Sequence, residues 1–426
     1  MRITLVVHKF LPSNVGGTET YTHNLARALS KEHEVFVFYR DDGEGESFIE
    51  EWQQRDGFRA WHVGRAFDAR RANPAALFFD TFYNRDIEVS FRRFLAEAQP
   101  DIIHFQHLML LSYRLLALAR RAGIPALLTL HDYWFLCANS QLIWPDGQVC
   151  QGKAGGINCA RCATARAGSP LMRAVRPVFA PLFQLRDVIV RRAALQAQHF
   201  VSPSHFLREQ YLAAGFPAEN FTVLENGIDV ERIHAFPRQP AQDGRLRVTY
   251  LGSLAWQKGV HVLVEAFREL PLDQVRLRVY GNLHAFPEYA AQLQSLANPA
   301  TTTFEGTVPN AEVGHVLAET DLLAVPSLWY ENSPVVIQEA AAAGVPVLAS
   351  RIGALPEKVR DGENGILVRA GDVLAWRMAL QQILEKPGRL LSLKANISSP
   401  MTNLEHADRI QRLYISLTGK DTWWER

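Results

Sequence analysis

The sequence contains no uninterrupted apolar run of the roughly 18 residues that a membrane-spanning helix needs. Its opening residues, MRITLVVHKF, are typical of a short strand followed by charges, and they lack the ordered regions of a secretory signal peptide. We therefore expect neither a transmembrane helix nor an export signal. A cytoplasmic location follows as the default expectation.

The chain also lacks an excess of charge of either sign. It has 45 basic and 44 acidic residues, which gives a net charge of +1. A nearly neutral chain without a basic excess is not typical of nucleic-acid-binding proteins, so no nucleic acid is expected as a partner. With 48% hydrophobic and 21% charged residues the composition is that of a globular protein, and 426 residues predict two or three domains.

Cysteine is scarce, and its four copies are confined to one segment with the spacing C-x12-C-x8-C-x2-C. The final Cys-x2-Cys is typical of metal sites, and four thiolates suit tetrahedral zinc. An iron–sulfur site, a redox pair and free buried thiols are the alternatives, whereas disulfides are not expected in a cytosolic protein. We predict a structural zinc that orders the Gly- and Ala-rich insert at 136–165. Its predicted ligands are Cys137, Cys150, Cys159 and Cys162.

Strand-like and helix-like patterns alternate along most of the chain. An apolar strand at 3–8, an amphipathic helix at 18–29 and a strand at 34–39 form a βαβ unit, which predicts a parallel sheet. Residues 41–100 are less regular: 41–46 predict an acidic turn, and the aromatic residues after them predict a helical region. Such a stripe is more often core than a ligand site, and an acceptor groove is the alternative. Its aromatic residues are Phe67, Phe78, Phe79, Phe82, Tyr83, Phe91 and Phe94.

The fold class predicted by these patterns is α/β, with two Rossmann-like parallel-sheet domains. The first is expected to span 1–200 and to contain the cysteine-rich insert. The second is expected to span 201–395, and a C-terminal segment at 396–426 is expected to cross back to the first domain.

The stretch 321–350 is the most informative one, and it predicts a strand, a loop, a helix and a second strand. Ser333 suits the N-cap, Pro334 the first helical position, and Gly344 the residue just past the helix end. The apolar run that follows resumes a parallel sheet.

Two glutamates flank the start of this helix, with Glu331 before it and Glu339 inside it. The free backbone amides of a helix N-terminus form an anion site, so a diphosphate could lie between two carboxylates that accept hydrogen bonds from hydroxyls. This arrangement suits a nucleotide-sugar. The alternative is a buried helix that carries two incidental acids.

The Glu-x7-Glu spacing, with ENSP inside it and AAAAGVPV after it, resembles the signature of the family 4 retaining glycosyltransferases of the GT-B fold. The resemblance implies two domains that face a cleft, with the donor mostly on the second and the acceptor on the first. It also implies sugar transfer from a nucleotide-sugar with retention, and no catalytic metal ion.

The resemblance assigns roles to residues of the second domain. Glu339 is expected to accept from the ribose hydroxyls, Glu331 to contact the hexose, and Lys258 to hold the diphosphate at a helix start. Ser253 stands where the family often has an arginine. The full expected donor-binding set in this domain is Lys258, Gly281, Val308, Ser333, Pro334, Val335 and Glu339.

The first domain contributes a Gly-Gly pair and a histidine. Gly16 and Gly17 precede a helix, where glycine lets the backbone approach a ligand; a simple tight turn is the alternative. In the resembled family this pair lies against donor phosphates and acceptor. His131 follows a strand, where ligands of open α/β sheets bind, and its context resembles the family segment that contacts the transferred sugar. His131 and Glu331 form the predicted catalytic pair, whereas His107 fits a structural role better.

Residues 169–198 carry five arginines, no lysine and one acid, with apolar residues at helical spacing. Such a segment can lie on an anionic membrane surface or form a solvated helix face packed on the domain. Pro177 and Pro181 are expected to break the helix. Surface contact would make the protein peripheral on the inner face of a membrane.

The predicted function is a glycosyltransferase that uses a UDP- or GDP-sugar and a glycan or lipid-linked acceptor, in cell-surface polysaccharide or glycolipid synthesis. A soluble sugar-phosphate or glycogen-type synthase is one alternative. A catalytically silent GT-B scaffold is another, and the missing arginine is its only support in the sequence.

Overall fold

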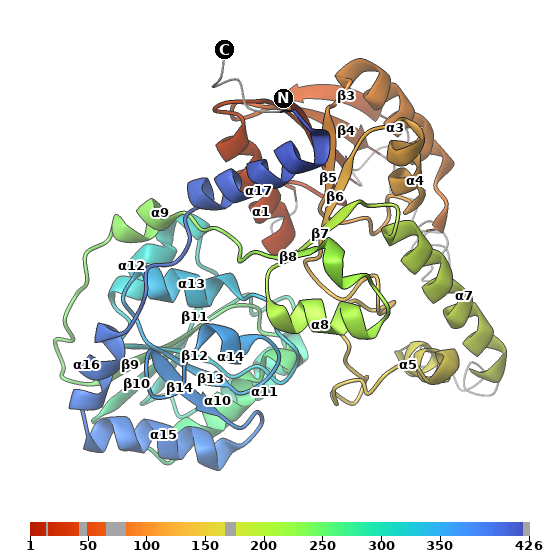
Figure 1. Cartoon of the computed structure of the whole chain (residues 1–426). Coiled ribbons are helices and arrows are strands. Elements are labelled where there is room, and N and C mark those ends of the chain that lie inside the picture. Colours follow the sequence, from red (N-terminus) through yellow and green to blue (C-terminus); the bar gives the residue numbers. More distant parts are fainter. Residues whose placement is uncertain (14–15, 42–48, 65–81, 167–175, 421–426) are drawn as a thin grey trace. The chain divides into compact units, whose positions relative to one another are not determined.

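The computed structural model describes the greater part of the chain (Figure 1). The described residues are 1–13, 16–41, 49–64, 82–166 and 176–420. Three aromatic residues of the predicted helical region and the start of the basic segment lie outside them, namely Phe67, Phe78, Phe79 and residues 169–175.

The chain divides into two compact units. The first contains Met1–Gln141, Gln151–Gly227 and Asn403–Arg426, and the second contains Leu142–Cys150 and Ile228–Thr402. The first unit therefore extends beyond the boundary predicted at residue 200, because two further strands complete its sheet.

The first unit is built on an eight-stranded sheet in the order β3-β4-β2-β1-β5-β6-β7-β8. Every neighbouring pair is parallel except β3 and β4. The strands are β1 (Arg2–Val7), β2 (Glu34–Asp41), β3 (Ile49–Gln54), β4 (Arg59–Gly64), β5 (Ile102–Phe105), β6 (Ala126–Thr129), β7 (His199–Ser202) and β8 (Phe221–Val223).

Strands β3 and β4 occupy a region for which the sequence analysis predicted no strand or helix. β3 lies at the sheet edge, and its sequence IEEWQQ leaves no residue buried. An edge strand does not need apolar side chains on both of its faces, so its sequence lacks the hydrophobic pattern of a buried strand. The aromatic residues of α3 (Arg85–Ala98) do enter the core, as predicted, since Phe91 and Phe94 are fully buried.

Helices cover both faces of the first sheet. The connections β1–β2 and β5–β6 leave the sheet centre in opposite directions, so right-handed crossovers place α1 (Gly17–Leu29) and α4 (Arg114–Arg121) on opposite faces. Contacts join α1 to α17 (Asn403–Thr418), and α4 and α5 (Ile157–Arg166) to α7 (Arg176–Ala194). α8 (His205–Ala213) connects β7 to β8.

Helix α7 is continuous although prolines occupy two of its positions. Pro177 lies in the first turn, where a backbone N–H would have no intrahelical acceptor, and Pro181 lies one turn later. The predicted break is therefore wrong at Pro181, whereas the segment before Pro177 lies outside the described residues. Both prolines fall close enough to the helix start that their missing donors interrupt little of the hydrogen-bond ladder.

The C-terminal helix α17 belongs to the first unit through buried polar contacts. The Tyr414 hydroxyl lies 2.7 Å from Nδ1 of His104, which is on β5, and Nε2 of His406 lies 2.8 Å from the Tyr21 hydroxyl, on α1. These are contacts between segments more than 300 residues apart in the chain. The segment that crosses back begins at Asn403.

The second unit contains a fully parallel six-stranded sheet in the order β11-β10-β9-β12-β13-β14. Its strands are β9 (Leu246–Leu251), β10 (Val275–Tyr280), β11 (Thr302–Gly306), β12 (Leu322–Val325), β13 (Val347–Ser350) and β14 (Gly365–Val368). Its helices are α9 (Val230–His234), α10 (Val260–Phe267), α11 (Pro287–Leu296), α12 (Val313–Ala318), α13 (Val335–Ala342), α14 (Leu355–Lys358), α15 (Val373–Glu385) and α16 (Gly388–Ala395).

Two separate hydrophobic clusters hold the faces of this sheet. One is centred on α10 and α15 and includes Phe267 and Trp376, and the other includes Ile337 of α13 and Leu317 of α12. Strands β9, β10 and β11 follow one another toward one edge of the sheet, and β12, β13 and β14 follow one another toward the other edge. The direction of the strand order therefore reverses between the neighbours β9 and β12. Ligands of open α/β sheets bind at such a switch point.

No helix among the described residues is long and apolar enough to cross a membrane.

Candidate active site

The loops that follow β9 and β12 meet through an ion pair at the switch point of the second sheet. Nζ of Lys258, after β9, lies 2.7 Å from Oε1 of Glu331, after β12. The Lys258 ammonium also lies 5.0 Å from the centre of the Trp329 ring, at cation–π distance. Lys258, which was expected to hold the diphosphate, is therefore in direct contact with Glu331, which was expected to contact the hexose.

Glu331 is held by three donors on one of its two carboxylate oxygens. Oε1 accepts from Lys258, from Ser327 Oγ at 2.6 Å and from Trp329 Nε1 at 2.8 Å, while Oε2 accepts from no described residue. Burial alone raises the pKa of Glu331, but the Lys258 charge and these hydrogen bonds outweigh it and leave the pKa lowered. The carboxylate is therefore ionised at neutral pH, and its second oxygen has no hydrogen-bond donor among the described residues.

Glycines allow the loops around this pair to approach closely. Gly259 has a φ of +70°, and a Cβ there would come within 2.0 Å of the Pro326 carbonyl oxygen. Gly353 has a φ of +58°, and a Cβ there would meet the backbone of Glu331 at 2.8 Å. Both positions combine left-handed backbone with a close approach, which only glycine accepts. The backbone N–H of Ala354 then donates to the Glu331 carbonyl at 2.9 Å.

Helix α13 begins one residue later than the sequence predicted. Pro334, not Ser333, is the N-cap, with φ −67° and ψ 115°, and Val335 is the first helical residue. Pro334 has no N–H, so the first-turn donors come from Val335 onward. Gly344 has a φ of +64° just past the C-cap Ala343, as predicted.

The displaced cap leaves the Ser333 side chain without its expected role. Its Oγ is buried and has no hydrogen-bond partner among the described residues. A buried hydroxyl without a partner costs free energy, and such groups in native structures require an explanation. A ligand anion at the start of α13 would supply an acceptor.

Glu339 lies inside α13 and is paired with an arginine that the sequence analysis missed. Arg232 of α9 donates through one guanidinium nitrogen to Glu339 Oε1 and through another to the Asn310 carbonyl. The side chains of Arg232 and Glu339 are 16% and 8% exposed. Asp229 caps α9 by accepting from the Arg232 amide. Asp229 is the last residue of the NGID turn, and this turn was the only local sequence signal near Arg232.

The remaining expected donor residues lie at the ends of neighbouring strands. Gly281 follows β10 and packs against the loop after β9, where a Cβ would come within 2.4 Å of the Gly252 carbonyl oxygen. Val308 follows β11 and packs against the cluster that contains Ile337 of α13. Both positions lie at the carboxyl edge of the sheet.

A second polar cluster lies at the switch point of the first sheet, after β1, β5 and β6. Nε2 of His131 lies 2.9 Å from Oε1 of Gln106, and the ring contacts Tyr21 edge-on. Burial, helped by the neighbouring His107, lowers the pKa of His131 to about 3. The imidazole is therefore neutral at physiological pH and donates from Nε2 to Gln106.

Two buried polar atoms in this cluster have no partner among the described residues. They are Nδ1 of His8 and Nε2 of Gln106. Nε2 of His8 lies 3.5 Å from Oε1 of Glu19, and burial lowers the pKa of His8 and raises that of Glu19. The orphaned atoms mark this end of the sheet as a place where a polar ligand would complete the hydrogen bonding.

The Gly-Gly pair starts α1 beside this cluster. Gly16 is the N-cap, and a Cβ there would come within 2.4 Å of Glu19 Oε2, whereas a Cβ at Gly17 would meet nothing within 4 Å. Gly16 therefore makes room for the Glu19 carboxylate, and Gly17 leaves open space at the helix start.

His107 has the structural role that the sequence favoured. Its Nδ1 accepts from the Met109 amide at 3.1 Å, so Nε2 carries the proton and donates to Asp132 at 3.2 Å. Asp132 also accepts from the Trp134 amide at 2.8 Å. Both ring nitrogens are used, and the residue fixes the segment that carries His131.

The four cysteines are divided between the two units, with Cys150 in the second and the other three in the first. Among the described residues, which include all four, no three His, Cys, Asp or Glu side chains come together as metal ligands. Cys150 lies in the hairpin Leu142–Cys150 of the second unit, where a Cβ at Gly147 would overlap the Trp256 ring. The zinc site stays a prediction for metal analysis.

Comparison with known proteins gives the family. The model described as Glycosyltransferase Family 4 matches residues 15–232, and the model described as Glycosyl transferases group 1 matches 231–399. The fold and the site define a GT-B glycosyltransferase. The chain belongs to glycosyltransferase family 4.

Similar curated proteins include the glycogen synthase of Mycobacterium tuberculosis (strain ATCC 25618 / H37Rv), which is 26% identical over 91% of this chain and 87% of its own length. The D-inositol 3-phosphate glycosyltransferase of Rhodococcus jostii (strain RHA1) is 36% identical, over 35% of this chain and 34% of its own. Glycosyl transfer is the activity common to these relatives.

Solved structures share the fold at low identity. HepE of Anabaena in complex with UDP superimposes with a TM-score of 0.66 at 17% identity, covering 98% of this chain and 100% of that one. The sucrose-phosphate synthase of Thermosynechococcus elongatus gives a TM-score of 0.68 at 19% identity, covering 98% and 99%. These likenesses establish the GT-B fold.

Proposed function

We propose that the protein transfers a sugar from a nucleotide-sugar, a UDP- or GDP-sugar, to a glycan or lipid-linked acceptor with retention at the anomeric carbon. The observation that carries the proposal is the Lys258–Glu331 pair, which lies at the switch point of the second sheet on the loop that leads into α13. The complex of HepE with UDP supports UDP-sugars as the first donors to examine.

The diphosphate would lie between the Lys258 ammonium and the first amides of α13. A lysine has three N–H donors, and the structure uses one of the Lys258 donors on Glu331. The others, with the amides from Val335 onward and the unpartnered Ser333 hydroxyl, would bind the leaving group as its negative charge develops.

The two glutamates would select the sugars on either side of that diphosphate. Oε2 of Glu331 is available to accept from a hexose hydroxyl, and Glu339, held in place by its ion pair with Arg232, would accept from the ribose hydroxyls. His131, neutral and oriented by Gln106, would offer an uncharged polar ring to the transferred sugar. None of these roles calls on a metal ion.

The test is a donor-hydrolysis screen across nucleotide-sugars, followed by determination of the anomeric configuration of the transferred product. Glu331→Ala should lose most transfer, and Glu385→Gln, an exposed carboxylate on α15, is the matched control. Equal turnover in Glu331→Ala and wild type would overturn the site. An inverted product would overturn the retaining mechanism alone.

A glycogen-type reaction is a second candidate for the acceptor side. Its support is the similarity to a glycogen synthase over most of both chains. Transfer to an α-glucan primer, measured against transfer to lipid-linked acceptors, separates the two. The hypothesis of a catalytically silent scaffold is supported only by Ser253, which stands in place of an arginine. A protein that neither binds nor hydrolyses any nucleotide-sugar would support this hypothesis.

A further inference from the structure

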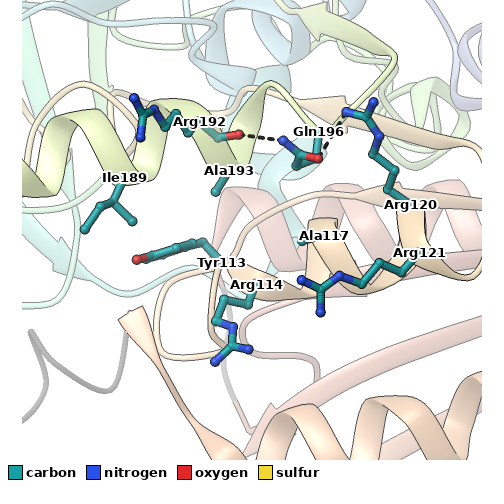
Figure 2. A pocket seen from close by; sticks show the side chains of 9 residues that line it. All are labelled: Tyr113, Arg114, Ala117, Arg120, Arg121, Ile189, Arg192, Ala193 and Gln196. Carbon is teal, nitrogen blue, oxygen red and sulfur yellow. Dashed lines mark hydrogen bonds between the residues drawn. The ribbon is translucent and has the colours of Figure 1, made fainter.

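An open pocket of about 580 Å³ lies between α4 and α7 in the first unit (Figure 2). Among the described residues no acidic side chain lines it, and the charged side chains of its lining are all arginines. These are Arg114, Arg120, Arg121 and Arg192. The rest of the lining is the ring of Tyr113, two alanines, an isoleucine and Gln196. A volume of this size is typical of sites that take a small molecule or a headgroup.

The arginines differ in how they are held. Arg120 donates to Gln196 Oε1 at 3.1 Å, and Arg114 lies 3.6 Å from Glu88. The guanidinium groups of Arg121 and Arg192 contact no partner in the described part of the chain, and both residues are exposed. Burial raises the pKa of Tyr113 to about 12, so its hydroxyl remains a donor. The pocket therefore offers donors and positive charge without an acceptor anion of its own.

An exposed apolar stripe on α7 runs into this pocket. Val178, Leu182 and Leu185 are 69%, 45% and 54% exposed. With Ile189 of the pocket lining they follow the 4-3-4 spacing of one helix face, and Arg192 continues the same face toward the end of α7 at Ala194. The stripe from Val178 to Ile189 is about 16 Å long at 1.5 Å per residue.

We propose that this face, the exposed stripe of α7 together with the arginine pocket, docks the first unit on an anionic phospholipid surface. Lipid phosphates would occupy the pocket, where guanidinium forks match phosphate oxygens. The leucines and Val178 would enter the boundary between headgroups and acyl chains. α7 would lie in the plane of the surface.

Charge complementarity favours lipid over other occupants. A free phosphate compound would fill the pocket but would leave three large apolar side chains in water. A second copy of this chain, docked through the same face in a two-fold dimer, would bring one set of four arginines against another. An anionic bilayer offers phosphates to the arginine pocket and an apolar boundary layer to the exposed stripe of α7 at the same time. The proposal does not depend on the glycosyl transfer proposed above.

The experiment is sedimentation of the full-length protein with vesicles of phosphatidylcholine alone and of phosphatidylcholine with phosphatidylglycerol. Wild type should bind the anionic vesicles and release them as salt rises. Arg121→Ser with Arg192→Ser should weaken this binding about 30-fold, since each interfacial arginine contributes roughly five- to sixfold. Leu182→Gln with Leu185→Gln should weaken it at least about tenfold.

The matched control is Arg409→Ser with Arg412→Ser, which removes the same charge from exposed positions on α17. This variant should bind like wild type. Circular dichroism melts check that every variant folds, and the binding ratio is compared only among variants with native melts.

Three results would overturn the proposal. Equal binding to neutral and anionic vesicles, or no binding to either, would contradict the predicted attraction between the pocket arginines and anionic phospholipid. Concentration-dependent dimers that Leu182→Gln with Leu185→Gln abolishes would assign the face to a second copy. Inorganic diphosphate that binds the pocket arginines while vesicles do not would assign the pocket to a free anion.

Discussion

Arg232 donates a hydrogen bond to the buried carboxylate of Glu339, although 107 positions separate the two residues in the chain. Arg232 lies on α9, one of the first helices of the second unit, and Glu339 lies on α13 at the switch-point edge of the sheet. The arginine is the counter-charge of a carboxylate side chain that is only 8% exposed.

Removing Arg232 should therefore weaken both the fold and donor binding. Arg232→Ala leaves Glu339 buried without its counter-charge, which should lower the free energy of unfolding by about 3 kcal/mol. The KM for the nucleotide-sugar should rise about tenfold while kcat changes less. Urea denaturation and nucleotide titration calorimetry measure the two effects. Glu231→Gln, an exposed change on the same helix, is the control and should alter neither.

Glu331→Gln should show how much the negative charge of Glu331 contributes to its pairing with Lys258, because the size of the side chain stays the same. The amide keeps the size of the side chain but cannot balance the ammonium, so we expect transfer to fall at least about 100-fold. Stability should fall by about 1–3 kcal/mol, since Lys258 is a quarter exposed and stays partly hydrated. Steady-state kinetics on a variant with a native melting profile is the measurement. Wild-type kcat/KM in this variant would contradict the assignment.

Ser333→Ala distinguishes a ligand site from a structural role. The hydroxyl has no partner within the described ranges, so its loss should leave the protein equally stable or up to about 1 kcal/mol more stable. If the hydroxyl binds the diphosphate, nucleotide affinity should fall about tenfold. Thermal melts with and without UDP and GDP report both quantities. A loss of stability with unchanged affinity would show that the residue only supports the loop.

The first unit should lose stability as pH falls below about 6.5. Burial lowers the pKa of His104, brings that of His131 to about 3 and that of His406 to about 4, so the folded chain keeps these rings neutral. Below the unfolded pKa of 6.5 the unfolded chain binds the extra protons, and stability decreases toward acid.

Each of these histidines should contribute a slope of up to about 1.4 kcal/mol per pH unit between 6.5 and its folded pKa. Chemical denaturation at several pH values from 5 to 8 measures the slope. His406→Asn should flatten it. A pH-independent stability across that range would show that these rings are not neutral in the fold.

Activity should not depend on an added divalent metal. The positive charge for the leaving diphosphate would come from Lys258 and the α13 amides, so excess EDTA should change the initial rate by less than about twofold. Metal analysis of the same sample tests the cysteines separately and should return about one zinc per chain if they bind it. A rate that collapses in EDTA and returns with Mg²⁺ or Mn²⁺ would contradict this expectation.

Local patterns predicted much of the fold correctly. β1 (Arg2–Val7) and β2 (Glu34–Asp41) lie where their apolar runs placed them, and Gly344 ends α13 as expected. These features depend on neighbours in the chain, whose periodicity and turn chemistry are visible in one sequence. The N-cap of α13 was misplaced by one residue because Pro334 takes an extended ψ and assumes that role itself.

The sequence by itself determined the family, the two parallel-sheet units and the spacing of Glu331 and Glu339, because these depend on short motifs and on hydrophobic periodicity. Only the tertiary structure decided that Arg232 pairs with Glu339, that Tyr414 contacts His104, and that four arginines line one pocket. Those contacts join segments far apart in the chain. Their partners are chosen by how helices pack on a sheet, and no local pattern records that choice.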